Sequence, residues 1–387
     1  MTIIMIGQKG LPPHSGGIER HVFDLARGLA KQGHRVIAYA RSWYTPQSGT
    51  IEAVEVRLTR GIHTKHLDAI THCWTALIDA KRFRPDIIHL HGTGIALLLP
   101  FARLMHPRAK MIVTIHCIDH TLAKWNAFAK LMFFAGEWLA CHVAHRTIVV
   151  SQALARYCVD RYGCVATYIP HPFTPMTTIA DPQILTPHGL APDGYFLCVA
   201  RLIPDKQVHT LIRAYAQARE RHPVAFHNRP LVIVGEGSWT DPYVRELQQM
   251  VSQTIHVKLI GERTGEELRA LQAQAYAHVL PSVSEGMAYA LIEAASLKRP
   301  IVMTNLPQNR EASGGEGVLV ESGNVESLTQ GLIVIATMPE SVRRAMGERL
   351  HAHTLRMFHP QERTKQIADV YRETVKTVSF ANAEAII

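Results

Sequence analysis

The sequence lacks long apolar runs, paired cysteines and an aromatic-rich surface pattern. Without an apolar run of about 18 residues, we expect no membrane-spanning helix. The first residues have no basic n-region and predict a buried strand, Thr2–Ile6, rather than a signal peptide. None of the six cysteines belongs to a C-x-x-C pair, which argues against a zinc knuckle or a disulfide framework and favours a reducing cytoplasm. Aromatic residues make up 7% and no nucleic-acid-reading module is present, so we expect no nucleic-acid partner.

The chain is long enough for two α/β domains, and its positive charge is concentrated in one half. Residues 1–180 hold 20 Lys and Arg against 10 Asp and Glu, whereas the remainder holds 21 against 22. Nucleic acid, anionic lipid headgroups and phosphorylated substrates could each account for this excess, and so could solubility alone.

Short β-branched runs alternate with amphipathic stretches, which predicts α/β domains with parallel sheets. In the first half the expected helices are Ile18–Lys31, Leu67–Arg82 and Lys124–Val143, and the expected strands are Thr2–Ile6, Arg35–Ala40, Asp86–Leu90, Met111–Ile115 and Thr147–Val150. In the second half the expected strands are Tyr195–Ala200, Leu231–Val234, His256–Ile260, Ala277–Pro281 and Pro300–Thr304.

A proline-rich interval from Pro170 to Pro192 separates the two series and predicts a linker. We therefore expect one Rossmann-like domain over residues 1–180 and a second over residues 190–359. Ligands of open α/β sheets bind at the carboxyl ends of the strands, so the expected site is a cleft between the two facing domains.

The segment Pro281–Ala294 contains the most specific pattern. Glu285 and Gly286 follow a strand and precede a helix, whose first N–H groups are unpaired and suit an anionic or hydroxyl-rich ligand. Carboxylates bind sugar hydroxyls well because each accepts several hydrogen bonds. Glu293 follows eight residues later, about two helical turns on. Taken alone, the two glutamates are equally compatible with ordinary helix residues.

Two further segments end strands with residues suited to phosphate. Arg201 and Lys206 flank a turn after the first strand of the second half, where two cations could neutralise a pyrophosphate. The first turn carries Gly16 and Gly17 immediately before a helix and lacks the G-x-G-x-x-G fingerprint. His116 also stands at a strand end.

With these motifs, the sequence resembles the retaining glycosyltransferases of family 4, which have the GT-B fold. The resemblance covers nearly the whole chain, and its hallmark is the pair of glutamates separated by seven residues, Glu285 and Glu293. It implies that Glu285 holds donor-sugar hydroxyls, that Glu293 holds the ribose, and that Arg201 and Lys206 clamp the diphosphate. Residues 360–378 are helical in pattern and, as in the family, are expected to cross back onto the first domain.

The resemblance also assigns the remaining candidate residues. It places His116 beside the transferred sugar, Gly16 and Gly17 at the donor diphosphate, and a further set around the donor, namely Gly235, Glu262, Arg263, Gly286, Met287 and Ala288. Two positions depart from the family pattern, since Gln207 and Cys117 stand where glycine is frequent. We expect no metal and no cofactor, because the family is generally metal-independent and the pair His89 and His91 lacks a third ligand.

The predicted function is retaining transfer of a hexose or deoxyhexose from a nucleotide-diphosphate sugar to a glycan or lipid-linked acceptor, in bacterial envelope or exopolysaccharide synthesis. The alternatives are a nucleotide-sugar epimerase of the same two-domain fold and a non-catalytic sugar-binding module. We expect a cytoplasmic protein with an anionic membrane surface as a candidate partner at the inner face of the plasma membrane. The basic, aromatic stretch Lys124–Phe134 suits such a surface, although a core helix with exposed lysines is the preferred interpretation.

Overall fold

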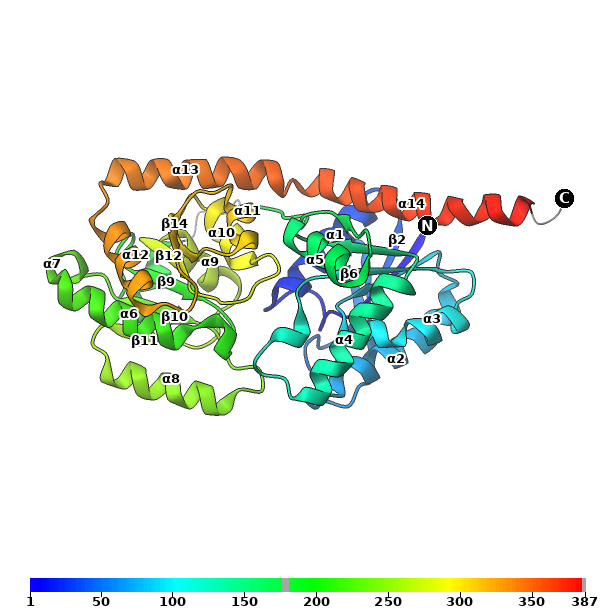
Figure 1. Ribbon diagram of the computed structural model, residues 1–387, viewed down its shortest axis with the longest axis horizontal. Helices are drawn as coiled ribbons and strands as arrows, with labels where there is room; N and C mark the ends of the chain where they lie inside the picture. Colours follow the sequence, from blue (N-terminus) through cyan, green and yellow to red (C-terminus); the bar gives the residue numbers. More distant parts are fainter. Residues whose placement is uncertain (176–180, 385–387) are drawn as a thin grey trace. The chain divides into compact units, whose positions relative to one another are not determined.

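The computed structural model describes residues 1–175 and 181–384, which form two compact units (Figure 1). The first unit comprises residues 1–121, 125–174 and the C-terminal segment from Phe358 onward, and the second comprises the other described residues up to Met357. The first boundary therefore follows Thr174, ahead of the expected interval 180–190, and the chain returns to the first unit at Phe358.

The first unit is built on an eight-stranded sheet of order β3-β4-β2-β1-β5-β6-β7-β8. Its strands are β1 Thr2–Ile6, β2 Arg35–Arg41, β3 Gly49–Ile51, β4 Val54–Thr59, β5 Ile87–His91, β6 Lys110–Ile115, β7 Arg146–Val149 and β8 Thr167–Tyr168. Neighbouring strands are parallel except for β3 and β4, which pair antiparallel and add an edge that the expected parallel sheet does not contain. The sequence-based strands omit β3, β4 and β8, and β3 and β8 are too short to show a hydrophobic period.

Helices cover both faces of this sheet, and the side-chain period of two decides which residues meet them. Val36 and Ala38 pack in one core cluster with residues of α1 and α14, so these two helices share a face. Tyr39 points to the other face, where its hydroxyl donates to Asp79 of α2 at 2.8 Å. The helices of the unit are α1 Gly17–Lys31, α2 Asp68–Ala80, α3 Leu99–Met105, α4 Ala127–His142, α5 Gln152–Tyr162 and α14 Pro360–Glu384, with 3-10 turns η1 Lys81–Phe83, η2 Gly94–Leu98 and η3 Asp119–Thr121.

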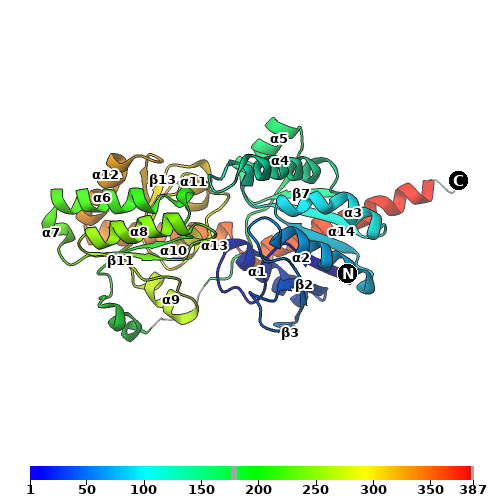
Figure 2. The ribbon, with the colours of Figure 1, turned by 90° about the horizontal axis from the view of Figure 1, so that it is seen from below.

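The second unit contains a six-stranded parallel sheet of order β11-β10-β9-β12-β13-β14. Its strands are β9 Phe196–Val199, β10 Leu231–Val234, β11 Val257–Leu259, β12 Ala277–Leu280, β13 Ile301–Thr304 and β14 Val318–Val320, and the last is absent from the sequence-based prediction. Its helices are α6 Val208–Arg221, α7 Pro223–Phe226, α8 Asp241–Gln253, α9 Gly265–Ala273, α10 Tyr289–Ser296, α11 Pro307–Ser313, α12 Val325–Thr337 and α13 Glu340–Met357, with 3-10 turns η4 Pro182–His188 and η5 Pro204–Lys206. Helices α6 and α8 lie side by side along this unit (Figure 2).

Part of the expected linker is folded into the second unit. Leu185 of η4 is fully buried and packs with Tyr195 and Leu197, so η4 closes one face of the second sheet. The prediction of a linker is therefore wrong over this turn, because Leu185 packs in the core of the second unit although prolines flank it in the sequence. Residues 176–180 of the same interval lie outside the described part of the chain.

Helix α4 differs from the core helix with exposed lysines that the sequence favoured. It begins at Ala127 because the side chain of Asn126 caps it, accepting from the N–H of Ala129 at 2.9 Å. Its buried face consists of small residues and one glutamate, whereas Phe128 and Leu131 are 69% and 58% exposed. Phe128 and Leu131 therefore face outward, whereas Phe133 and Phe134 of the same helix are half-buried, and the preferred interpretation is wrong only for the exposed apolar residues.

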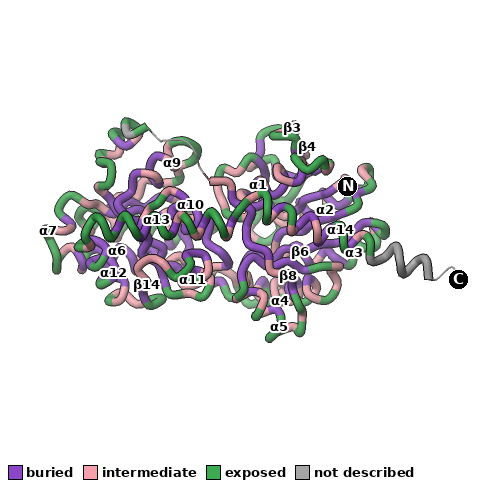
Figure 3. Tube along the Cα trace, turned by 90° about the horizontal axis from the view of Figure 1, so that it is seen from above, coloured by how far each residue is buried: buried purple, intermediate pink, exposed green. Residues whose placement is uncertain are grey.

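Burial follows the layers in both units, with the central strands buried and exposed residues gathered on helices such as α3, α5 and α7 (Figure 3). Within residues 1–175 and 181–384, no helix is both long and apolar enough to cross a membrane. Each sheet reverses its strand order once, between β1 and β5 in the first unit and between β9 and β12 in the second. The loops after these strands are the places where open α/β sheets bind ligands.

Candidate active site

An ion pair marks the reversal point of the second sheet. Lys206 follows β9 and Glu285 follows β12, so the two loops that flank the reversal point meet through these side chains. The ammonium donates to Glu285 Oε1 at 2.5 Å, and the two side chains are only 16% and 10% exposed. The structure thus brings together two charged residues that are 79 positions apart in the chain.

The turn that presents Lys206 contains a residue in the left-handed region. Gln207, which replaces the glycine frequent in the family, has φ 53°. Its side chain compensates locally, since Nε2 donates to the Pro204 carbonyl at 3.1 Å and Oε1 accepts from Thr210 Oγ1 at 2.7 Å. A glycine is favoured here because it adopts this φ without strain, and glutamine holds the same turn with hydrogen bonds.

Arg201 stands on the same loop and is exposed. Among the described residues its guanidinium has no ion-pair partner within 4 Å. The loop is fixed on either side, because the N–H of Leu202 donates to the Glu236 carbonyl at 2.8 Å and its carbonyl accepts from Thr240 Oγ1 at 2.6 Å. The backbone is therefore ordered while the guanidinium remains available to an anion.

The glutamate pair lies on two different kinds of structure. Glu285 is in a loop, because α10 begins only at Tyr289. The predicted helix begins directly after Glu285, which would place the amides of Gly286, Met287 and Ala288 in its first turn. Those three residues are buried and precede the helix. Glu293 lies within α10, where its Oε2 accepts from the Nε2 of the buried Gln272 at 2.7 Å. Gln272 orients Glu293, and it is not among the residues predicted from the sequence, because nothing in its local pattern distinguishes it from an ordinary helix residue.

The other three candidates of the second unit follow β10 and β11. Gly235 has φ 149°, and a Cβ there would lie 1.8 Å from the carbonyl oxygen of Ala200, so the glycine lets the β9 and β10 ends approach closely. Glu262 is exposed, whereas Arg263 pairs with Glu267 of α9 at 2.9 Å. Arg263 is thus already paired, and Gly235 has a structural role whatever ligand binds.

In the first unit, Gly16 and Gly17 lie where the β1 loop enters α1. Gly16 has φ 98°, and a Cβ would lie 2.0 Å from Oε2 of Glu19. Glu19 is 5% exposed, and its carboxylate accepts from the N–H of Lys9 at 2.9 Å, which ties the loop back to the helix. Glycine is favoured here because L residues rarely adopt this φ, and the Glu19 carboxylate also lies where a side chain would begin.

A buried cluster of imidazoles surrounds His116, which directly follows β6. His116 is 7% exposed, and its Nε2 lies 3.3 Å from Nδ1 of His91, the last residue of β5. His21 of α1 adds a third ring, and its Nδ1 lies 2.8 Å from Nδ1 of His171. The expectation of no metal rested partly on His91 having no third ligand nearby. That premise is wrong, because His21 and His116 both lie beside His91. His89 takes no part, since both its ring nitrogens contact hydroxyls, those of Tyr371 and Thr114.

Burial keeps these imidazoles uncharged. Desolvation lowers the pKa of His21, His91 and His116 well below the ordinary value, and the neighbouring histidines lower it further. Neutral imidazole is the form that accepts a hydrogen bond or binds a cation. His21 and His171 lie 150 residues apart, so only a folded-chain contact could identify this cluster.

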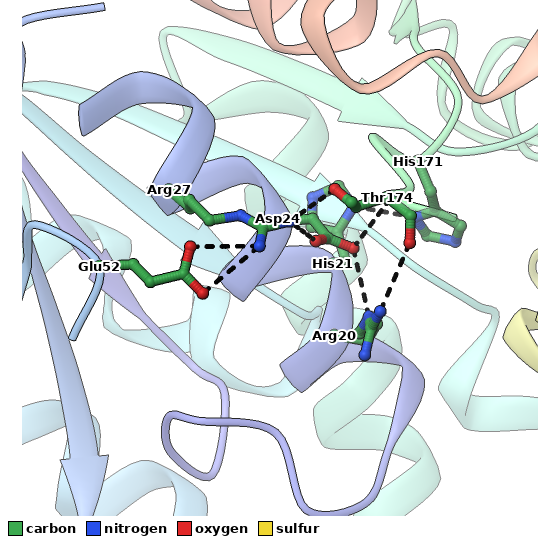
Figure 4. Close-up of polar contacts among 7 residues, drawn as sticks. All are labelled: Arg20, His21, Asp24, Arg27, Glu52, His171 and Thr174. Atoms are coloured by element: carbon green, nitrogen blue, oxygen red, sulfur yellow. Dashed lines mark hydrogen bonds and ion pairs between the residues drawn. The ribbon is translucent and has the colours of Figure 1, made fainter. Parts of the chain in front are cut away.

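The chain segment that carries His171 is fastened to α1 (Figure 4). Asp24, whose side chain is 1% exposed, pairs with Arg20 at 3.3 Å and Arg27 at 2.8 Å, and it accepts from the N–H of Thr174 at 3.4 Å. Burial raises the pKa of Asp24, and the two arginines oppose that rise. This network holds His171 against His21 at the point where the chain leaves the first unit.

Cys117 accommodates the loss of the glycine frequent in the family. It is not among the residues with positive φ, and its Sγ lies 3.3 Å from Oδ1 of Asp119. Asp119 also accepts from Thr93 Oγ1 at 2.9 Å, which joins the loops after β5 and β6. The His116 loop is therefore held by side chains rather than by a glycine turn.

Comparisons with known proteins agree with this architecture. The family model described as Glycosyltransferase Family 4 matches residues 15–175, and that described as Glycosyl transferases group 1 matches residues 193–337. The D-inositol 3-phosphate glycosyltransferase of Salinispora tropica is 29% identical over 400 residues, which cover 93% of this chain and 82% of that protein. The glycogen synthase of Mycobacterium tuberculosis is 26% identical over 385 residues, 89% and 88% of the two chains. The crystal structure of Anabaena HepE in complex with UDP and glucose superposes with a TM-score of 0.76 at 20% identity, over 96% and 100% of the chains.

Two Rossmann-like parallel-sheet units and matching transferase families define an enzyme of the glycosyltransferase class with the GT-B fold. The chain belongs to glycosyltransferase family 4.

Proposed function

We propose that the enzyme uses a nucleotide-diphosphate sugar as donor and transfers its hexose or deoxyhexose with retention of anomeric configuration. The observation that carries this proposal is the Lys206–Glu285 pair at the reversal point of the second sheet, with Arg201 exposed on the same loop. The cations suit a diphosphate and the carboxylate suits sugar hydroxyls. The complex of HepE with UDP and glucose supports a donor of this kind.

In the proposed reaction the bond between the anomeric carbon and the diphosphate oxygen breaks, and its electron pair goes to the leaving phosphate. The acceptor hydroxyl forms the new bond on the same face, and its proton passes to the leaving phosphate oxygen. Arg201 and Lys206 stabilise the developing negative charge, which is the largest contribution that such sites make. Because two protein cations supply this charge, we propose that donor binding needs no metal.

The donor proposal is tested by melting the protein with a panel of nucleoside diphosphates. A ligand present at 100 times its Kd stabilises by about 2.7 kcal/mol, and we expect the rise in melting temperature to disappear in Arg201→Gln. Arg213→Gln, on α6, is the matched control and should retain the rise. A rise of equal size in both variants would contradict the assigned role of Arg201.

We further propose a glycan or lipid-linked acceptor, used at the cytoplasmic face of the membrane in envelope or exopolysaccharide synthesis. Two features of the first unit support this, the excess of ten positive charges over residues 1–180 and the outward-facing Phe128 and Leu131 of α4. The Salinispora relative is named for a phosphorylated acceptor, D-inositol 3-phosphate. Basic residues near an anionic surface contribute on the order of 1 kcal/mol each, and salt screens that attraction.

Sedimentation with vesicles tests the membrane contact. Anionic vesicles should carry the protein down at low salt, neutral vesicles much less, and Lys124→Glu/Lys130→Glu should weaken the effect. Lys31→Glu/Lys81→Glu makes the same charge change on exposed lysines of the first unit, outside the stretch Lys124–Phe134, and should bind nearly as well as the wild type. Equal partition into neutral and anionic vesicles, or none, would contradict the membrane proposal.

The epimerase alternative differs in its requirement for a second substrate. None of the relatives reported above is an epimerase, and the comparisons give that alternative no support. If the enzyme inverted the configuration at a carbon of the donor sugar with no acceptor present, that result would support the epimerase alternative. We expect the sugar to leave the donor for a product only when an acceptor is present.

A further inference from the structure

We propose that His21, His91 and His116 bind one divalent transition-metal cation, with Zn²⁺ the preferred ion. One ring nitrogen from each of the three residues lies within 4.8 Å of one from each of the others. Tetrahedral zinc with Zn–N bonds of about 2.0–2.1 Å separates its ligand nitrogens by about 3.3 Å, so small side-chain rotations complete the site. Imidazole is a preferred ligand of zinc and of cobalt, nickel and copper.

Two buried nitrogens lack the partners that buried polar atoms normally have. Nε2 of His21 and Nε2 of His91 make no hydrogen bond to any residue of the described chain, and the two residues are 1% and 2% exposed. A buried polar atom without a partner costs free energy, and a cation bound at these nitrogens would remove that cost. His89 lies two residues before His91 in the same strand, and both of its ring nitrogens have hydrogen-bond partners. The other buried histidine of this strand is therefore satisfied by the protein itself.

The surroundings also suit a ligating histidine. Metal-binding imidazoles commonly donate their second N–H to an acceptor, which fixes the ring and directs the other lone pair at the metal. His21 can do this through Nδ1, which lies 2.8 Å from Nδ1 of His171 (Figure 4).

The position of the cluster connects it with ligand binding. The last residue of β5, the residue after β6 and helix α1 supply the three rings, beside the reversal point between β1 and β5. Three neutral histidines leave the fourth position of zinc to a water or a substrate atom, and they leave the ion its positive charge. An anionic fourth ligand, such as hydroxide or a phosphate oxygen, is therefore favoured. This inference does not depend on the proposed donor, because the Lys206–Glu285 pair belongs to the other unit.

The test uses the whole chain of 387 residues without a tag and needs no activity measurement. After chelation and dialysis, Co²⁺ is titrated into the protein, since four-coordinate cobalt gives intense visible bands that surface histidines do not. We expect one equivalent to bind with such bands, Zn²⁺ to displace it, and the ion to raise the melting temperature.

Three matched variants locate the site. His21→Asn and His91→Asn each replace an imidazole by an amide that can occupy the Nδ1 position, and His89→Asn makes the same change on β5 outside the ligand set. Because changes to the partners of ligands alone cost about 10–100-fold in affinity, loss of a ligand should weaken Zn²⁺ binding by at least about 100-fold in the first two variants only. Absence of the cobalt bands in the wild-type chain, or equal affinities in all three variants, would overturn the proposal. The wild-type titration decides the question even if a variant fails to fold.

Discussion

Replacing Lys206 by Met and Glu285 by Gln, singly and together, separates the proposed catalytic role of this ion pair from its structural role. Each single change leaves one charged group in a site where the side chains are 16% and 10% exposed. Removing one partner of a fully buried pair costs about 3–5 kcal/mol, and this residual exposure places the expected cost near the lower value. Since about 1 kcal/mol corresponds to roughly 2–4 °C for a unit of this size, each single variant should melt about 6–12 °C lower.

The double variant should behave differently in stability and in turnover. A neutral pair of similar volume often replaces a buried ion pair at little cost, so we expect Lys206→Met/Glu285→Gln to regain most of the lost stability. Transfer should stay impaired, because removing one donor that stabilises developing charge costs about 2.7–4 kcal/mol, or roughly 10²–10³ in kcat.

Melting by calorimetry and initial rates at saturating donor measure the two quantities on the same preparations. The reasoning fails if the double variant recovers both its stability and near-wild-type turnover, since the pair would then be structural. It also fails if the single variants are as stable as the wild type, because the charges would then be solvated. A double variant that is stable and slow matches the proposed diphosphate and sugar contacts.

Three further changes test the surrounding structure. Gly235→Ala should destabilise the protein by more than about 2 kcal/mol, because its Cβ would lie 1.8 Å from a carbonyl oxygen. The control Gly33→Ala, at φ 84° with no atom within 4 Å of the added Cβ, should cost only about 1 kcal/mol, and urea titration measures both values. Asp24→Asn should lower stability by about 3 kcal/mol, because it leaves two arginines without their buried carboxylate. The Glu52 side chain is 47% exposed, so Glu52→Gln should cost less than about 1 kcal/mol, and equal losses in the two variants would refute the role of burial. Burial lowers the pKa of His278 to about 4, below the unfolded value of about 6.5, so protons bind preferentially to the unfolded chain and stability falls as pH drops from about 6.5 toward 4. The melting temperature should therefore decrease from pH 7 to pH 5 with a shallower slope in His278→Gln, and identical slopes would contradict the assignment.

Much of the architecture followed from local pattern. Runs such as Thr2–Ile6 and Leu231–Val234 predicted strands with the observed bounds, because buried parallel strands are continuous apolar segments. Short or exposed strands such as β3 escaped prediction, since three residues cannot show a period. Leu185 was assigned to a linker because prolines surround it, although the contact that buries it lies with Tyr195 and Leu197.

The sequence likewise predicted only part of the candidate site. The sequence placed His116, Arg201, Lys206 and Glu285 at strand ends, because residues directly after a buried strand must lie at the edge of the sheet. It also supplied the family, through the spacing of its glutamates.

Distances between side chains belong to the tertiary structure, because the contacting residues are 21 to 150 positions apart and no local pattern relates them. Only the folded chain decides that Lys206 pairs with Glu285, that Gln272 orients Glu293, and that His21 joins two strand-end histidines. The sequence by itself determined which residue types stand at the strand ends, and strand order and helix packing decided which of them meet.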